Sequence, residues 1–170
     1  MAFFRIKKIK GKEYAYIVEN EWKRKGSRQK VKGYAGRVHR FNLVNNASFS
    51  EHLKIEDAQS YIENNGNNRI INDLVEWELF KFGVSREEFL VDLSNKKIQK
   101  NKKNVALIVN DGFMCSLTLK NLFEFKPEGD EQTDGYRLAR AFVEAGIKVP
   151  QEIFIGLFGK LYKTEDKAGG

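Results

Sequence analysis

Positive charge is concentrated at one end of this 170-residue chain. Residues 1–40 hold thirteen Lys and Arg against three Glu, a net charge of +10, whereas residues 41–170 hold 17 basic and 20 acidic side chains. Clustered lysines and arginines displace the counterions that condense on nucleic-acid phosphates, and they therefore favour polyanionic partners. The chemistry that this segment indicates is noncovalent recognition of phosphate groups.

Two groups of residues are candidates for such contacts. The first combines N-terminal cations with three ring-bearing side chains and comprises Arg5, Lys7, Lys8, Lys10, Trp22, Lys23, Arg24, Lys25, Arg28, Lys30, Lys32, Tyr34, Arg37, His39 and Arg40. The second is a lysine run expected to form an exposed loop, with Lys96, Lys97, Lys100, Lys102 and Lys103. For any single lysine, solubilisation of an exposed strand or loop is the alternative interpretation. The second group can contact the same polyanion only if it lies beside the first.

Strand patterns position the first group. β-Branched and aromatic residues predict strands over 4–9, 13–18 and 28–34, joined by short turns that contain glycine. The sequence thus predicts a basic three-stranded antiparallel module over residues 1–41. Trp22 falls in the second expected turn, and the tyrosines of the second strand are expected to pack within the sheet. Because side chains alternate along a strand, one face of the third strand is expected to present Lys30, Lys32 and Tyr34.

This module resembles the N-terminal region of IS4-type insertion-sequence transposases, over about a quarter of the chain. The resemblance is carried by Tyr14–Glu19, a basic turn with glycine, and Arg28–Arg37. Members of that family often show Val-Glu-Ser, a basic turn and Arg-Gln-x-Val-x-x-Tyr-Leu-Gly; here Asn20 replaces the serine and Ala35 the leucine. The resemblance implies a nucleic-acid-associated module. It does not imply transposition, because the family's catalytic carboxylates belong to a long RNase H-like domain that this sequence does not show.

The following residues predict an α+β body over 51–163. Apolar spacing and capping residues predict helices at 54–63, 67–82, 85–90 and 136–145, and one that starts at Pro150. A central β-hairpin is expected from strands 105–109 and 113–119 around Asn110-Asp111-Gly112. Residues 164–170 are expected to be a disordered tail. The fold class is therefore α+β, a small basic sheet followed by a mixed helical body.

Known catalytic motifs are missing from the sequence. It has no P-loop, dinucleotide fingerprint, Cys-x-x-Cys or His-Glu-x-x-His, and its two histidines, His39 and His52, lack the spacing of metal ligands. Cys115 alternates with leucines, which indicates a buried apolar role. The acidic residues considered as candidate metal ligands lie on the expected 67–82 helix and are Asp73, Glu76 and Glu78. We expect no cofactor.

These observations give one leading hypothesis and two alternatives. The leading one is a non-catalytic nucleic-acid-binding protein, weakly sequence-specific, with RNA or DNA as partner. The alternatives are a metal-dependent phosphodiester-processing enzyme or remnant from a mobile element, and a protein-interaction adaptor, in a ribonucleoprotein complex, that docks through its C-terminal helices. With one cysteine and no apolar run near the ~20 residues of a membrane span, we expect a cytoplasmic protein without a membrane partner.

Overall fold

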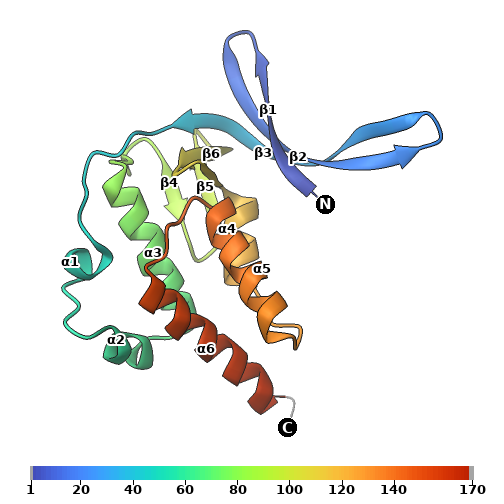
Figure 1. Cartoon of the computed structure of the whole chain (residues 1–170). Coiled ribbons are helices and arrows are strands. Elements are labelled where there is room, and N and C mark those ends of the chain that lie inside the picture. The colour runs from blue at the N-terminus through green and yellow to red at the C-terminus, as the bar shows by residue number, and fades with distance from the viewer. Residues whose placement is uncertain (1, 169–170) are drawn as a thin grey trace.

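The computed structural model describes the backbone of residues 2–168 and the side chains of residues 2–162 (Figure 1). Its strands are β1 (Ala2–Ile9), β2 (Lys12–Lys23), β3 (Gly26–Arg40), β4 (Leu90–Asp92), β5 (Lys97–Lys100), β6 (Lys103–Val109) and β7 (Gly112–Met114). Its helices are α1 (Phe49–Leu53), α2 (Ala58–Asn64), α3 (Asn67–Lys81), α4 (Ser116–Phe123), α5 (Glu131–Glu144) and α6 (Gln151–Ala168). The strands form one mixed sheet in the order β1-β2-β3-β6-β5-β4, with β7 also paired to β6. The expected α+β class is confirmed.

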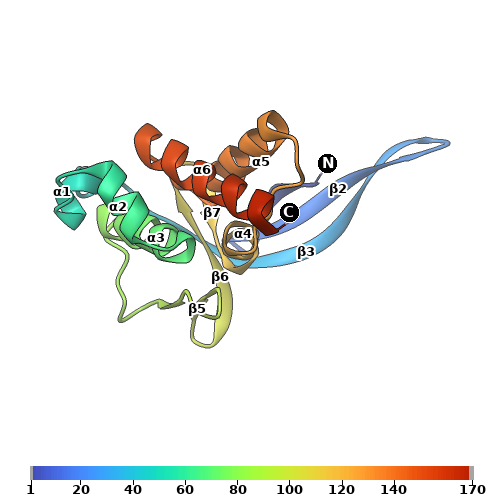
Figure 2. The same cartoon turned by 90° about the horizontal axis from the view of Figure 1, so that it is seen from below.

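Two antiparallel hairpins, β1–β2 and β2–β3, form the N-terminal part of the sheet. The three predicted strands are present but longer than the sequence pattern indicated. As a result, Trp22 belongs to β2 and pairs with Ser27, instead of lying in the turn. The β2–β3 hairpin projects from the helical body as a two-stranded arm (Figures 1 and 2).

The arm and the body share one continuous sheet. Arg37–Arg40 at the end of β3 pair in parallel with Val105–Ile108 of β6. β6 also pairs with β5 near its start and with β7 near its end, so it is a central strand, as its apolar sequence predicts. The expected 1–41 module therefore has no sheet of its own.

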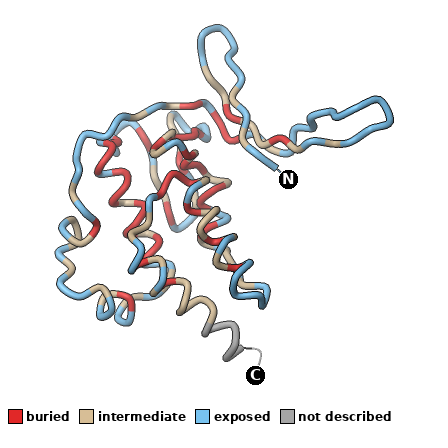
Figure 3. The backbone as a smooth tube through the Cα atoms, in the orientation of Figure 1, coloured by how far each residue is buried: buried red, intermediate tan, exposed pale blue. Residues whose placement is uncertain are grey.

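Helices α3, α4, α5 and α6 pack beside β6 and enclose the larger core (Figure 2). Alternate residues of β6, such as Leu107 and Val109, face this core and are fully buried. Figure 3 shows that burial is concentrated in the body, whereas the distal arm is exposed. Gly83 and Gly146 follow α3 and α5 with φ of 62° and 77°, the left-handed conformation that ends helices.

Several expectations for the body were wrong. The expected 54–63 helix starts only at Ala58, as α2, and a separate short helix, α1, precedes it. The helix expected from Ser85 is a turn that leads to β4. The lysine run forms β5 and the start of β6 instead of a loop, because Ile98 is buried in the core and the strands pair around the turn at Asn101-Lys102.

The expected strand 113–119 stops at Met114, and α4 begins at Ser116. The hydroxyl of Thr118 accepts a hydrogen bond from the Cys115 N–H (3.1 Å), which caps the helix and ends the strand. At the C-terminus, α6 continues to Ala168, so residues 164–168 of the expected disordered tail have helical backbone; residues 169 and 170 lie outside the described part. None of the described helices is both long and apolar enough to span a membrane.

Candidate nucleic-acid interface

The strand register divides the side chains of β1–β3 between two faces. Tyr16 pairs with Tyr34, whereas Glu19, three positions further along β2, pairs with Lys30. Since side chains alternate along a strand, these two pairs point to opposite sides of the sheet. We name the side of Tyr16 the outer face and the side of Glu19 the inner face.

The outer face combines cations with aromatic rings. The rings of Tyr16 and Tyr34 lie 5.1 Å apart between centroids, and the Lys7 ammonium lies 5.1 Å from the Tyr16 centroid. Arg5 donates a hydrogen bond to Gln29 across β2, above the buried Val18. The face presents Arg5, Lys7, Lys12, Tyr14, Tyr16, Trp22, Tyr34, Arg37 and His39.

The inner face holds all the carboxylates of the N-terminal segment. Glu13, Glu19 and Glu21 pair with Arg40 (2.9 Å), Lys32 (3.4 Å) and Lys30 (3.4 Å), respectively. Nearer the body, this face is apolar and packs into a smaller core that contains Ala15, Ala35 and Val38. There Phe4 of β1 stacks on Phe113 of β7, with 4.6 Å between the ring centroids. The outer face of β1–β3 therefore carries positive charge without a matching carboxylate.

One expectation is overturned here: Lys30 and Lys32 do not share a face with Tyr34. Two residues of β3, Lys32 and Ala35, are extra relative to β2 and form bulges between paired positions. A bulge adds one residue and interrupts the two-residue alternation. The lysines consequently contact glutamates of the inner face, while Tyr34 lies outside.

The sequence-predicted residues fall into three places. Arg5, Lys7, Trp22, Tyr34, Arg37 and His39 lie on the outer face. Lys10, Arg24 and Lys25 occupy the two turns of β1–β3. Lys8, Lys23, Arg28, Lys30, Lys32 and Arg40 have the register of the inner face, so the structure does not gather all the candidates on one surface.

The lysine-rich β5–β6 hairpin lies beside the outer face and forms a hollow of about 570 Å³ with it. We name this hollow the basic pocket. Its lining contains no carboxylate and consists of Lys12, Tyr14, Tyr34, Arg37, His39, Lys100, Asn101, Lys103, Asn104 and Val105. Its four cations form no ion pair with the described carboxylates.

The other lysines of the second group are more distant from this arrangement. Lys96 pairs with Glu124 at 3.0 Å. Lys97 and Lys102 are exposed at the start of β5 and in the β5–β6 turn, and neither lines the basic pocket. The structure thus brings Lys100 and Lys103 beside the N-terminal sheet.

His39 is the most unusual polar group of the basic pocket. Its Nε2 is buried and has no hydrogen-bond partner within the described part of the chain. Its ring lies edge-on to Phe89 (5.1 Å), and Phe89 also lies 5.3 Å from the Lys100 ammonium. Burial, with the nearby positive charges of Lys100 and Arg37, lowers the pKa of His39 below its ordinary 6.5. The imidazole is therefore neutral at neutral pH.

Five lining residues are not among the sequence-predicted candidates: Lys12, Tyr14, Asn101, Asn104 and Val105. The strand pattern puts Lys12 in a turn and predicts a packing role for Tyr14. Lys12, Tyr14 and Tyr16 occupy alternate positions of β2, and this period-two spacing places them on one face. Burial raises the pKa of Tyr34, assisted by Tyr16 and Tyr14, so its hydroxyl remains a donor at neutral pH.

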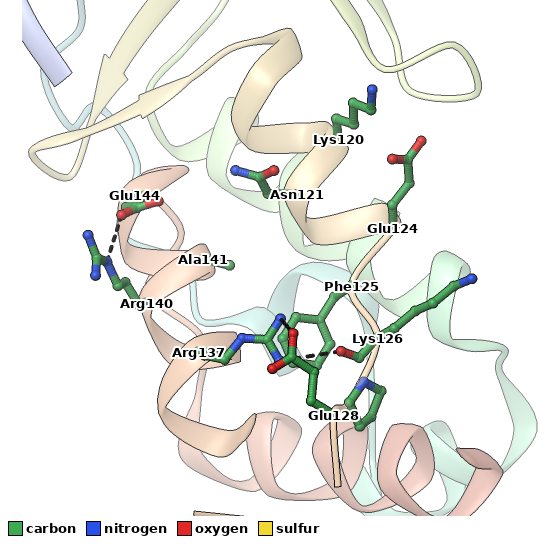
Figure 4. Close-up of a pocket in the computed structure, with 11 residues that line it drawn as sticks. Lys120, Asn121, Glu124, Phe125, Lys126, Glu128, Arg137, Arg140, Ala141 and Glu144 are labelled. Atoms are coloured by element: carbon green, nitrogen blue, oxygen red, sulfur yellow. Dashed lines mark hydrogen bonds and ion pairs between the residues drawn. The ribbon is translucent and has the colours of Figure 1, made fainter. Parts of the chain in front are cut away.

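A second hollow, of about 470 Å³, lies between α4 and α5 (Figure 4). Its arginines are already paired: Arg137 contacts Glu128 (3.5 Å) and Asp134 (2.9 Å), and Arg140 contacts Glu144 (2.8 Å). This hollow combines four cations with three carboxylates, in contrast to the basic pocket, whose lining has no carboxylate.

The residues on which the alternative hypotheses depend can also be located in the structure. Asp73, Glu76 and Glu78 pair separately with Arg69, Arg86 and Lys81, and no three His, Cys, Asp or Glu side chains in the described range are grouped to hold a metal. The apolar stripe of α6 packs into the core, with Ile153 and Leu157 buried. Cys115 is buried as expected, and burial raises the pKa of its thiol.

Comparisons of the chain with protein-family models, with curated proteins and with solved structures find no match.

Proposed function

We propose that this protein binds nucleic acid without catalysis, and that the outer face and the basic pocket contact the phosphate backbone. One observation carries the proposal: every carboxylate of the N-terminal segment lies on the inner face, so the cations of the outer face are unneutralised. The resemblance of this segment to the N-terminal region of IS4-type transposases favours the same class of partner.

The aromatic rings favour nucleic acid over other polyanions. Tyr16 and Tyr34 lie among cations, and Trp22 is 85% exposed near the tip of the arm. Basic grooves with flat aromatic surfaces suit a ligand that alternates phosphates and bases. Because backbone contacts carry no sequence information, binding is weakly sequence-specific.

The experiment is a fluorescence anisotropy titration of labelled RNA and DNA oligonucleotides over a series of salt concentrations. We expect the logarithm of the affinity to fall linearly with the logarithm of salt, with a slope of about −0.7 to −0.9 for each phosphate neutralised. Absence of binding, or binding independent of salt, contradicts the proposal.

Two matched double variants locate the contact. Lys100→Ala with Lys103→Ala removes two charges from the basic pocket, and we expect it to weaken binding and flatten the salt slope by about two contacts. Lys30→Ala with Lys32→Ala removes the same charge from the ion-paired inner face. A larger loss of affinity in this control than in the pocket variant would place the contact on the inner face and contradict the proposal.

A further inference from the structure

We infer that the basic pocket receives an unpaired base together with its phosphate, so that the ligand is single-stranded nucleic acid. This inference rests on the proposed function and narrows its ligand. It is carried by the way in which the pocket places aromatic and cationic side chains around one concavity.

The aromatic wall is available to a flat ligand. Tyr34 is 51% exposed although it packs against Tyr16, and Tyr14 lines the same hollow. A base that stacks on an exposed ring gains affinity whichever base it is, because every base has a π-face. The tyrosines therefore supply the contact that phosphate-binding lysines cannot supply.

The cations are placed on several elements around this wall. Lys12 comes from β2, Arg37 from β3, and Lys100 and Lys103 from the β5–β6 hairpin. A phosphate attached to a stacked nucleotide would lie among these side chains. The ring of His39 also lines this hollow, although its Nε2 is buried and closed to a ligand there.

A duplex does not satisfy this arrangement. Within a double helix the faces of the bases are stacked on each other, so only phosphates, sugars and groove edges are accessible. A concave pocket of about 570 Å³ has the size of small-molecule sites and suits one splayed nucleotide. Trp22 is also on the outer face and is 85% exposed. It offers a second stacking surface for a base further along the bound nucleic-acid strand.

The test compares an oligonucleotide with an abasic analogue of equal length, since both carry the same phosphates. At constant salt we expect the wild-type protein to bind the normal oligonucleotide about fivefold to a hundredfold more tightly than the abasic one. The duplex of the same sequence is expected to bind more weakly than the single strand.

Variants at one ring attribute the difference to the pocket. Tyr34→Leu should reduce the ratio of the affinities for the normal and the abasic strand, whereas Tyr34→Phe should keep this ratio. Tyr136→Leu, at an exposed tyrosine of α5, is the matched control and should have no effect. Circular dichroism verifies the fold of each variant, and the wild-type comparison remains decisive if Tyr34→Leu does not fold.

The outcomes separate the two proposals. Equal affinity for the normal and abasic strands, with salt dependence retained, overturns the inference and leaves the proposed function intact. Tight duplex binding that does not change when Tyr34 is substituted also overturns the inference and leaves the proposed function intact. Failure of every oligonucleotide to bind removes the proposed function itself.

Discussion

Gly36 of β3 lies so close to the backbone of Asn104 that a Cβ atom at this position would overlap the Asn104 carbonyl oxygen. The same Cβ would also lie 2.8 Å from the Cα of Val105. This approach is where the N-terminal strands join the body, immediately before β3 and β6 begin to pair. The absence of a side chain at Gly36 therefore allows the outer face and the lysines of the β5–β6 hairpin to meet.

Gly36→Ala is expected to lower the free energy of unfolding by several kcal/mol. The φ of Gly36 is 120°, which is strained for any L side chain and costs about 1–3 kcal/mol, and the overlap with Asn104 adds about 1–3 kcal/mol. Urea unfolding followed by circular dichroism measures the loss.

Gly26 is a matched control, because its φ of 119° is nearly identical but nothing lies within 4 Å of its Cβ position. Gly26→Ala should therefore lower the free energy of unfolding only by the cost of the strained φ. If both variants lose the same stability, close packing of β3 against β6 makes no contribution.

Glu78 supplies a second prediction, because it is a fully buried carboxylate. Its oxygens lie 3.1 Å from the Lys81 ammonium, and they accept hydrogen bonds from the Asn110 amide (2.8 Å) and the Lys148 N–H (3.0 Å). Glu78→Leu leaves Lys81 buried without its partner, so we expect a loss of about 3–5 kcal/mol in urea unfolding.

The double variant Glu78→Leu, Lys81→Leu removes both charges and should be more stable than Glu78→Leu alone. A double variant that is no more stable than the single one would show that the uncompensated lysine is not the main cost.

The third prediction concerns pH. The folded-state pKa of His39 lies below its ordinary 6.5, because of burial first and then Lys100 and Arg37, with Glu88 acting in the opposite direction. The unfolded chain thus binds a proton at a higher pH than the folded chain does. Stability should fall as the pH is lowered from 6.5 toward the folded-state pKa.

Urea unfolding of wild type and His39→Gln over the pH range from about 7.5 to 5 checks this expectation. The variant should lose less stability on acidification, since the other titrating groups are common to both proteins. Parallel pH profiles would mean that His39 is not the group responsible.

The sequence was sufficient to predict the elements whose local signals agree. Alternating β-branched and aromatic residues around Gly11 predicted the first hairpin, and Asn110-Asp111 has the positive φ angles, 49° and 61°, of a tight two-residue turn. The apolar run 105–109 predicted a central strand because its residues are apolar on both faces.

Other elements depend on tertiary contacts that no local pattern reveals. Cys115–Leu119 is apolar enough for a strand or a helix, and the cap formed by Thr118 decides for a helix. The charge pattern located the cations in one segment of the chain. It could not assign them to faces, because the bulges at Lys32 and Ala35 follow from pairing with β2 and not from the sequence of β3.

The bulge at Lys32 also has an evolutionary consequence. Its neighbours Val31 and Gly33 pair with Val18 and Ile17, which are adjacent on β2. Loss of residue 32 would make the ladder regular there without turning any other side chain to the opposite face. Ala35 is buried in the smaller core, whereas Lys32 is exposed. Homologues whose third strand is one residue shorter at Lys32 would retain the same outer face.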